Sequence, residues 1–207
     1  MRRVWRQRRL PGGTFLRRVR TVRAVVFALA ACLPLFSCVM AHDTVDSGRT
    51  VDCPAVIAAQ AVAFAVQYRD AETEYAWGGQ DALRAALRLD CSGLVVRCYG
   101  YAVEDSPYCL LFADASSADL YADYARLVAL DALRQGDLLF MGEPGTDRVT
   151  HIALFDRAES GNIYFIDATK KDTDGDGIDD INGVTARHYA ADDERIKAFS
   201  IMQVRTL

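Results

Sequence analysis

The sequence predicts an α+β fold in which helices come first and strands follow. An alanine-rich amphipathic stretch opens at Pro54 and continues to about Arg69, with proline at a position that helix starts favour. A second helix is predicted from about Cys91 to Tyr101, where an apolar run follows an acidic residue. From Gly136 onward, short apolar and β-branched runs alternate with Gly, Pro and Asp loops, which is typical of an antiparallel sheet.

Five strands are predicted after the helices, and turn residues separate them. They cover residues 137–141, 149–155, 162–167, 184–189 and 199–204. Before them, Ser116 or Ser117 followed by Asp119 predicts the cap of a further helix that reaches about Leu130. Residues 80–89 have helical composition and form an insertion-like segment between the two main helices.

Composition suits one compact domain preceded by a leader. The chain has 207 residues, of which 51% are hydrophobic and 25% are charged. Nine arginines and no acidic residue lie in residues 1–40, so the remainder carries a net charge of about −13. An acidic domain is unsuited to nucleic acid, and we expect no nucleic-acid partner. Residues 41–53 are polar and predict a linker, which leaves residues 54–207 as the folded domain.

The leader, residues 1–40, has an arginine-rich start followed by the apolar residues 24–36, which is typical of an export signal. The apolar stretch is short for a membrane span. It resembles bacterial lipoprotein signals, which implies processing and lipid attachment at Cys38 or Cys32. We favour Cys38 because it leaves a more normal apolar length, although Cys32 follows smaller residues. Cleavage near Ala41 without lipid is the alternative.

The six cysteines do not form a metal-binding pattern, since no pair has C-x-x-C spacing. Cys98 lies seven residues after Cys91 on the same predicted helix, which indicates a core thiol. For Cys53 and Cys109, a disulfide formed in an oxidising compartment and two isolated buried thiols both remain open.

Cys91 is the candidate nucleophile. It follows Asp90, a predicted N-cap, so its thiol meets the unpaired N–H groups and the positive dipole end of a helix, which favour thiolate. A cysteine nucleophile also needs a base. His151 opens an apolar run that is predicted as a buried strand, and a core strand holds a base firmly. His42 lies beside the leader and His188 lies in a charged segment, so both are weaker candidates.

Four motifs occur in a fixed order along the chain. They are Tyr75-Ala76-Trp77-Gly78-Gly79, Asp90-Cys91-Ser92-Gly93, Gln135-Gly136-Asp137-Leu138-Leu139-Phe140, and His151-Ile152-Ala153-Leu154 before Phe165-Ile166-Asp167-Ala168. Together they resemble the NlpC family, the NlpC and p-sixty group of papain-like bacterial cell-wall cysteine peptidases. The resemblance covers roughly residues 55–206. It implies a papain-like fold, with N-terminal helices packed on an antiparallel sheet of about five strands.

The resemblance also implies catalytic roles. Cys91 would attack an amide carbonyl, His151 would act as general base and acid, and Asp167 would hold the imidazole in the required orientation and tautomer. The family usually has histidine, asparagine or glutamine at the third position, so Asp167 is a departure, and a strand-end turn residue is the alternative reading. Tyr75 matches a family tyrosine near the nucleophile and is expected to offer its hydroxyl to the oxyanion beside the Cys91 N–H. A core aromatic residue is its alternative. No cofactor is expected for catalysis.

One acidic stretch, residues 172–180, departs from the family pattern and resembles the first part of a calcium-binding loop. Alternating carboxylates bring several oxygens together, a glycine permits the sharp turn, and one backbone carbonyl completes the series. The twelfth position is Gly183, where a bidentate acid is expected, so Asp179 or Asp192 would have to close the site. A solvated acidic loop is the alternative to a structural calcium site. The candidate ligands are Asp172, Asp174, Asp176, Ile178 and Asp180.

Taken with the leader, the resemblance implies an exported, lipid-anchored, monomeric cysteine peptidase of the bacterial cell envelope. Its expected substrate is the peptidoglycan stem peptide, cut between D-glutamate and a diamino acid. A papain-like amidase or acyltransferase on another substrate would use the same Cys–His pair. A non-catalytic, calcium-binding surface lipoprotein is the alternative from another class, and the intact Cys91 and His151 argue against it.

Overall fold

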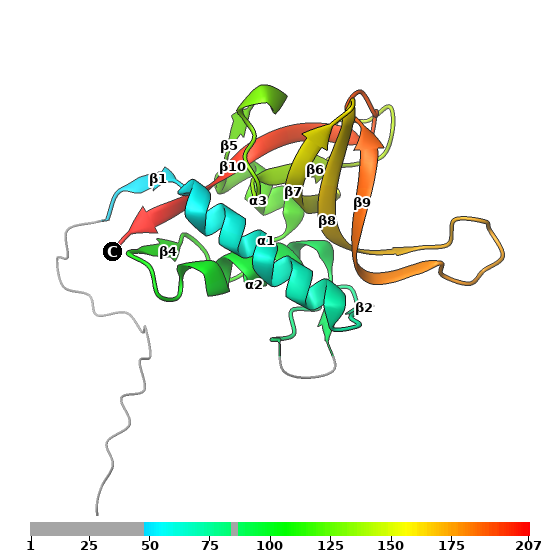
Figure 1. Cartoon of the computed structure of the whole chain (residues 1–207), viewed down its shortest axis with the longest axis horizontal. Helices are drawn as coiled ribbons and strands as arrows, with labels where there is room; N and C mark the ends of the chain where they lie inside the picture. The colour runs from blue at the N-terminus through cyan, green and yellow to red at the C-terminus, as the bar shows by residue number, and fades with distance from the viewer. Residues whose placement is uncertain (1–47, 84–86) are drawn as a thin grey trace, which may run out of the picture. The chain divides into compact units, whose positions relative to one another are not determined.

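The computed structural model describes residues 48–83 and 87–207. The described part of the chain is α+β, with the helices in its first half and most of the sheet in its second (Figure 1). The helices are α1 (Ala55–Asp70), α2 (Cys91–Val103) and α3 (Ser117–Asp123), and a short 3₁₀ turn, η1, covers Leu130–Ala132. The predicted class and the two main helices are therefore confirmed.

Within the described residues, the main sheet is antiparallel and has eight strands rather than the expected number of about five. Its path runs β1-β10-β6-β7-β8-β9, and β4 and β5 also pair with β10. A separate two-stranded parallel pair joins β2 to β3. The strands are β1 (Thr50–Asp52), β2 (Glu74–Tyr75), β3 (Arg88–Leu89), β4 (Tyr108–Leu110), β5 (Ala125–Val128), β6 (Leu138–Met141), β7 (His151–Glu159), β8 (Asn162–Lys171), β9 (Ile181–Ala190) and β10 (Ile196–Thr206).

The five predicted strands correspond to β6 to β10, and the three additional strands are short. β1, β4 and β5 have three or four residues each, and all of them pair along β10. Short edge strands carry little periodic signal, because their pairing is decided by a partner far away in the chain. β1 lies inside the stretch that the sequence predicts as a linker.

Helix α1 packs closely because its inner face is built from small residues. Ala58, Ala61 and Ala65 are fully buried and recur every three or four positions, so they share one side of the helix. A Cβ atom on Gly136, before β6, would lie 1.9 Å from the Ala58 carbonyl oxygen. Gly136 also has φ of 91°, which side-chain-bearing residues rarely adopt. Glycine is therefore required where the sheet begins beneath α1.

Strand β6 is apolar throughout because both of its faces are buried. Leu138 and Phe140 point into the core that α1 and α2 share with the sheet. Leu139 and Met141 point into a second core on the opposite face. Side chains alternate along a strand, so a strand with two buried faces needs a continuous apolar run.

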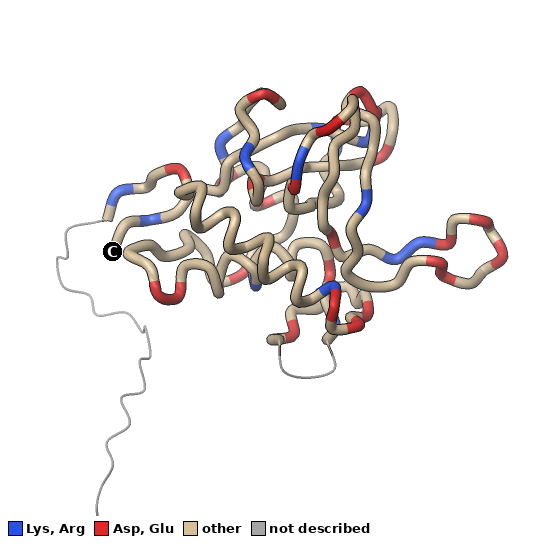
Figure 2. Tube along the Cα trace, in the orientation of Figure 1, with Lys and Arg blue, Asp and Glu red and all other residues tan. Residues whose placement is uncertain are grey.

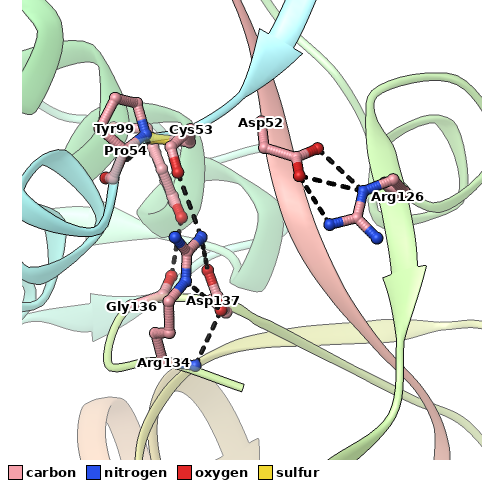
Figure 3. A network of polar contacts seen from close by, with 8 residues as sticks. All are labelled: Asp52, Cys53, Pro54, Tyr99, Arg126, Arg134, Gly136 and Asp137. Atoms are coloured by element: carbon pink, nitrogen blue, oxygen red, sulfur yellow. Dashed lines mark hydrogen bonds and ion pairs between the residues drawn. The ribbon is translucent and has the colours of Figure 1, made fainter. Parts of the chain in front are cut away.

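An ion pair with a buried carboxylate holds the start of β6 (Figure 3). The Asp137 side chain is fully buried, and Arg134 donates to it from its backbone N–H at 2.8 Å and from its guanidinium at 3.2 Å. The same guanidinium donates to the Cys53 carbonyl at 3.1 Å, while Tyr99 of α2 donates its hydroxyl to the Gly136 carbonyl at 2.7 Å. These bonds join the entry to α1, the body of α2 and the first strand of the central sheet.

Two predicted elements differ from the structure. The predicted cap is present, because Ser116 and Asp119 form a reciprocal capping box. The helix that follows, however, ends at Asp123 instead of near Leu130, since β5 then pairs with β10, and this tertiary pairing overrides local helical composition. In the insertion-like segment, the described residues contain no helix, and residues 84–86 lie outside the described part.

The predicted leader, with Cys32 and Cys38, lies outside the described residues, as does the adjacent His42. The four described cysteines, Cys53, Cys91, Cys98 and Cys109, are free, so a Cys53–Cys109 disulfide is not formed. Within residues 48–83 and 87–207, no helix is long and apolar enough to cross a membrane.

Candidate active site

Cys91 is the first residue of α2. The preceding Asp90 has extended backbone angles and caps the helix, because its carboxylate accepts from the Gly93 N–H at 2.7 Å. The Ser92 hydroxyl donates to the same oxygen at 3.0 Å. The thiol therefore stands at the positive end of a 13-residue helix, as the sequence predicts.

The Tyr75–Gly79 turn packs directly on this helix start. The Gly78 N–H donates to the second Asp90 oxygen at 2.8 Å, so one carboxylate joins the turn to the helix. A Cβ atom on Gly93 would lie 2.1 Å from the Gly79 carbonyl oxygen. Glycine at position 93 therefore allows the turn to approach the nucleophile, which explains why the two motifs occur together.

His151 is the first residue of β7, and its imidazole lies between the thiol and a carboxylate. The ring Nε2 lies 2.5 Å from Oδ2 of Asp167. Burial acts to lower the pKa of His151, but hydrogen bonds with Asp167 and with the Cys91 thiol outweigh it and raise the pKa to about 9. The imidazole is therefore protonated at neutral pH, and it can give a proton to a leaving group.

Asp167, in β8, is fully buried. Burial acts to raise the pKa of its carboxyl group, but hydrogen bonds from His151 and Arg187 hold that pKa below its usual value. The residue is therefore a charged partner of the imidazole within the strand rather than a strand-end turn residue.

Arg187, in β9, is the member of this group that the sequence analysis missed. Its Nε donates to Oδ1 of Asp167 at 3.0 Å, its Nη2 donates to Oδ2, and its Nη1 donates to the Tyr189 hydroxyl at 2.9 Å. Asp167 pairs with Thr185 in the β8–β9 register, so Arg187 lies diagonally opposite on the same face. Two-residue spacing within a predicted strand would have placed Arg187 and Tyr189 together, but the register to β8 is not readable from the sequence.

Tyr75 lies in β2 and is partly buried beside the nucleophile. Burial, together with the negative charges of Cys91 and Asp90, raises the pKa of its hydroxyl to about 12. The hydroxyl therefore keeps its proton and remains a hydrogen-bond donor near the thiol. Its backbone N–H donates to the Asn182 side chain at 2.9 Å, which ties the turn to β9.

A cavity of about 230 Å³ opens beside the nucleophile. Cys91 and Thr150 line it, as do the Tyr75–Gly79 turn through Trp77 and the start of α3 through Ser116. Trp77 is 88% exposed, so an aromatic surface stands at the rim, where it can contact a bound peptide. The structure thus offers a thiol, a proton donor and an open binding space in one place.

His188 does not take part in this group, since it is exposed on β9 and its ring lies near that of Tyr164.

The acidic loop projects between β8 and β9 (Figures 1 and 2). Three of its carboxylates come together there: Asp172, Asp174 and Asp176.

The loop provides only part of a calcium coordination shell. Asp180 does not join the three carboxylates, because its carboxylate accepts hydrogen bonds from Thr173. Lys170 pairs with Asp179 at 2.9 Å, and Gly183 brings no side chain to the twelfth position. Ile178 is 70% exposed, and the Asp172 carboxylate is bonded to N–H groups of its own loop. The calcium site therefore stays a prediction.

A model of the NlpC/P60 family matches residues 72–190, more than half of the chain. The chain belongs to the NlpC/P60 family. Members of this family are generally cysteine peptidases that act on cell-wall peptides and need no cofactor for catalysis. The fold is accordingly the papain-like fold of NlpC/P60 proteins, with an enlarged sheet.

Three solved structures are similar to the chain at low identity. NlpC1 from Trichomonas vaginalis is 17% identical, with a TM-score of 0.46, over 72% of this chain and 45% of that one. NlpC2 from the same organism is 19% identical, with a TM-score of 0.47, over 75% and 49%. A similar-to-lipoprotein NLP/P60 protein from Staphylococcus aureus is 19% identical, with a TM-score of 0.41, over 79% and 45%. The chain thus spans about half the length of these NlpC/P60 structures, and no curated protein matches it.

Proposed function

We propose that the protein is a cysteine peptidase that hydrolyses peptidoglycan stem peptides at the bond between D-glutamate and a diamino acid. The observation that supports this most directly is that His151 is bonded to Asp167 and lies close enough to the Cys91 thiol for that thiol to raise the pKa of the imidazole. Family membership supports the cell-wall substrate class.

In the proposed mechanism, the Cys91 thiolate attacks the scissile carbonyl carbon while the imidazolium of His151 stands beside it. A C–S bond forms, and the carbonyl oxygen takes the negative charge. The backbone N–H at the helix start and the Tyr75 hydroxyl are the donors that stabilise this oxyanion. The intermediate then breaks its C–N bond as His151 gives its proton to the leaving amine.

The resulting thioester is hydrolysed by water. His151, now neutral, takes a proton from the attacking water, and the second tetrahedral intermediate expels the Cys91 thiolate. Asp167 keeps Nε2 of the imidazole hydrogen-bonded throughout, so the other ring nitrogen remains directed at the reacting atoms. The cycle ends with the original thiolate–imidazolium pair.

The test is digestion of purified peptidoglycan, followed by mass spectrometry of the released fragments. We expect fragments whose new amino terminus is the diamino acid, and none with the Cys91→Ala protein. An acyltransferase would instead attach an added amine to the new carboxyl end. A non-catalytic binding protein would release nothing, and that result would overturn the proposal.

We further propose that residues 1–40 export the protein and that Cys38 carries a lipid, with Cys32 as the alternative. The basic-then-apolar composition of the leader supports this proposal. An anchor at this position would hold the peptidase at the membrane of the cell envelope, within reach of the wall.

A further inference from the structure

A second cavity, of about 310 Å³, adjoins the one that contains Cys91. Thr150 lines both cavities, and His151 lines the second. Its other walls come from the end of β6, from β8 and β9, and from the residues before β10. A substrate that lies across Thr150 can therefore contact the nucleophile on one side and this second cavity on the other.

Three cationic side chains line the second cavity: Lys171, Arg187 and Arg195. We call it the cationic cavity. Arg187 is bonded to Asp167, and Arg195 is paired with Asp193 at 2.6 Å. Lys171 donates to the Tyr189 hydroxyl at 3.1 Å and forms no ion pair with any residue that the structure describes. Its ammonium charge is therefore available to a ligand.

Tyr189 stands among these three cations. Its hydroxyl oxygen accepts from Lys171 at 3.1 Å and from Arg187 at 2.9 Å, and the Arg195 guanidinium lies 3.6 Å from its ring centroid. A phenol oxygen has two acceptor positions and one proton. Because the two cations occupy the acceptor positions, the proton of Tyr189 is left to donate to a third group. An ammonium and a hydroxyl donor thus face one cavity.

The charges around the cavity favour an anion over a neutral group. Glu143 is the acidic residue in its lining, and it is exposed to solvent, where its charge is screened. Asp167 is paired with Arg187 and Asp193 with Arg195, and neither carboxylate is part of the lining, although Asp193 is near enough to interact with the Lys171 charge. The chain as a whole has a formal net charge of −4, so a cationic cavity beside His151 is a local exception.

We propose that the cationic cavity binds a carboxylate of the substrate on the leaving-group side of the scissile bond, and this rests on the proposed function. His151 gives its proton to the leaving amine, so the part of the substrate beyond that amine lies next to His151. The carboxylate accepts from the Lys171 ammonium and the Tyr189 hydroxyl, which are charge-assisted and directional contacts. A substrate that carries a neutral amide there loses the ionic partner.

The chain offers a matched control in the neighbouring residue. Lys170 and Lys171 are consecutive in β8, so their side chains point to opposite faces of the sheet. Lys170 is exposed and paired with Asp179 at 2.9 Å, and it does not line the cavity. Lys170→Met and Lys171→Met therefore remove the same charge from the same strand on different faces.

The experiment compares two synthetic stem peptides. In one, the diamino acid ends in a free carboxylate, and in the other that carboxylate is a primary amide. We expect the native protein to prefer the free carboxylate by about tenfold in kcat/KM, mainly through KM, which corresponds to about 1.4 kcal/mol. Lys171→Met should abolish this preference by weakening only the carboxylate peptide, Tyr189→Phe should reduce it, and Lys170→Met should keep it. Equal kcat/KM values for the two peptides with the native protein, or a preference that survives in Lys171→Met, would overturn the proposal.

A binding measurement separates this inference from the proposed function. The free diamino acid and the compound in which the same carboxylate is a primary amide are titrated separately into the Cys91→Ala protein and followed by NMR. We expect the acid to bind about tenfold more tightly than the amide, and Lys171→Met to remove the difference. If neither peptide is cleaved but this difference is present, the proposed function fails and the cationic cavity stands. If both ligands bind equally, the cavity is not a carboxylate site.

Discussion

Arg187 donates hydrogen bonds to both carboxylate oxygens of Asp167, and His151 contacts one of the same oxygens. A fully buried carboxylate is costly unless it is paired, and two cationic partners supply that compensation here. A neutral side chain at this position, which is usual in the family pattern, would need no such arginine. The departure at Asp167 and the presence of Arg187 are therefore two parts of one arrangement.

Replacing Arg187 should impair catalysis through Asp167. In Arg187→Gln the carboxylate loses a cationic partner, the pKa of Asp167 rises, and activity should be lost at a higher pH on the acid side than in the native protein. We expect at least a tenfold fall in kcat/KM near neutral pH, equivalent to about 1.4 kcal/mol. Arg187→Lys should retain part of the activity that Arg187→Gln loses. The measurement is the pH profile of kcat/KM, with the exposed Arg157→Gln as a control that stays native-like.

Cys91 and Cys98 should separate catalysis from packing. Cys91→Ala should abolish cleavage and leave the fold intact, because Cys91 borders an open cavity at the helix start. Cys98 is fully buried in the core, so Cys98→Ala should keep cleavage and lower the free energy of unfolding by about 1 kcal/mol. Cleavage assays and thermal melts of both variants provide the comparison, and cleavage retained in Cys91→Ala would refute the mechanism.

Asp167 should matter less than His151. Asp167→Asn keeps a hydrogen-bond partner for the imidazole and removes the charge, whereas Asp167→Ala removes both. In a serine triad the loss of the aspartate charge costs roughly four orders of magnitude, and a cysteine enzyme should be less sensitive because its thiol ionises more readily. We expect activity to decrease from Asp167→Asn to Asp167→Ala to His151→Ala. Stem-peptide cleavage rates, with folding checked by circular dichroism, give the order; native rates in Asp167→Ala would exclude the role.

The titration of His151 should appear in both activity and stability. The pKa of His151 is about 9 in the folded protein, above the ordinary value of 6.5, so folding favours its proton. The alkaline limb of kcat/KM should therefore lie near pH 9 and move lower in Asp167→Asn. The corresponding gain in stability should be complete below pH 6.5 and disappear as the pH rises through about 9. Denaturant unfolding of the native protein and of His151→Ala across this pH range tests whether the free energy of unfolding falls as the pH rises.

The mature amino terminus should be a lipid-modified cysteine. If Cys38 is the processing site, the protein should partition with membranes, and Cys38→Ala should release it. Cys32→Ala is the control that should leave membrane association unchanged. Mass spectrometry of the mature protein decides the matter, and an unmodified terminus at Ala41 or His42 would contradict the anchor.

The sequence predicts those parts of the fold that depend on local chemistry. The Asp90 cap, the start of α2 at Cys91 and the strand that begins with His151 all follow from residue type and spacing. The helix that ends early at Asp123 and the strand β5 depend on pairing with β10, a partner about 75 residues away, which local composition does not encode.

In the candidate site, too, the sequence predicts the residues that depend on local chemistry and not those that depend on distant strand pairing. Cys91 and His151 are recognisable because each stands at the start of its element, next to a motif. In the sequence, Arg187 is recognisable only as a charged residue on a strand whose side chains alternate in exposure. Its contact with Asp167 depends on the β8–β9 register, and a shift of one residue would turn its side chain to the other face.

From the pairing of β1 with the end of β10, we expect a particular resistance of the domain to mechanical force. Gly48 leads into β1, whose ladder joins Thr50 to Arg205 and Asp52 to Gln203. A pull along β1 loads these hydrogen bonds side-on and all at once, in shear, rather than one after another as in unzipping. The Asp52–Arg126 ion pair at 2.6 Å adds a link across the same region. Tension on a tether would therefore be resisted first at this edge of the sheet, before it reaches the α2 helix that carries Cys91.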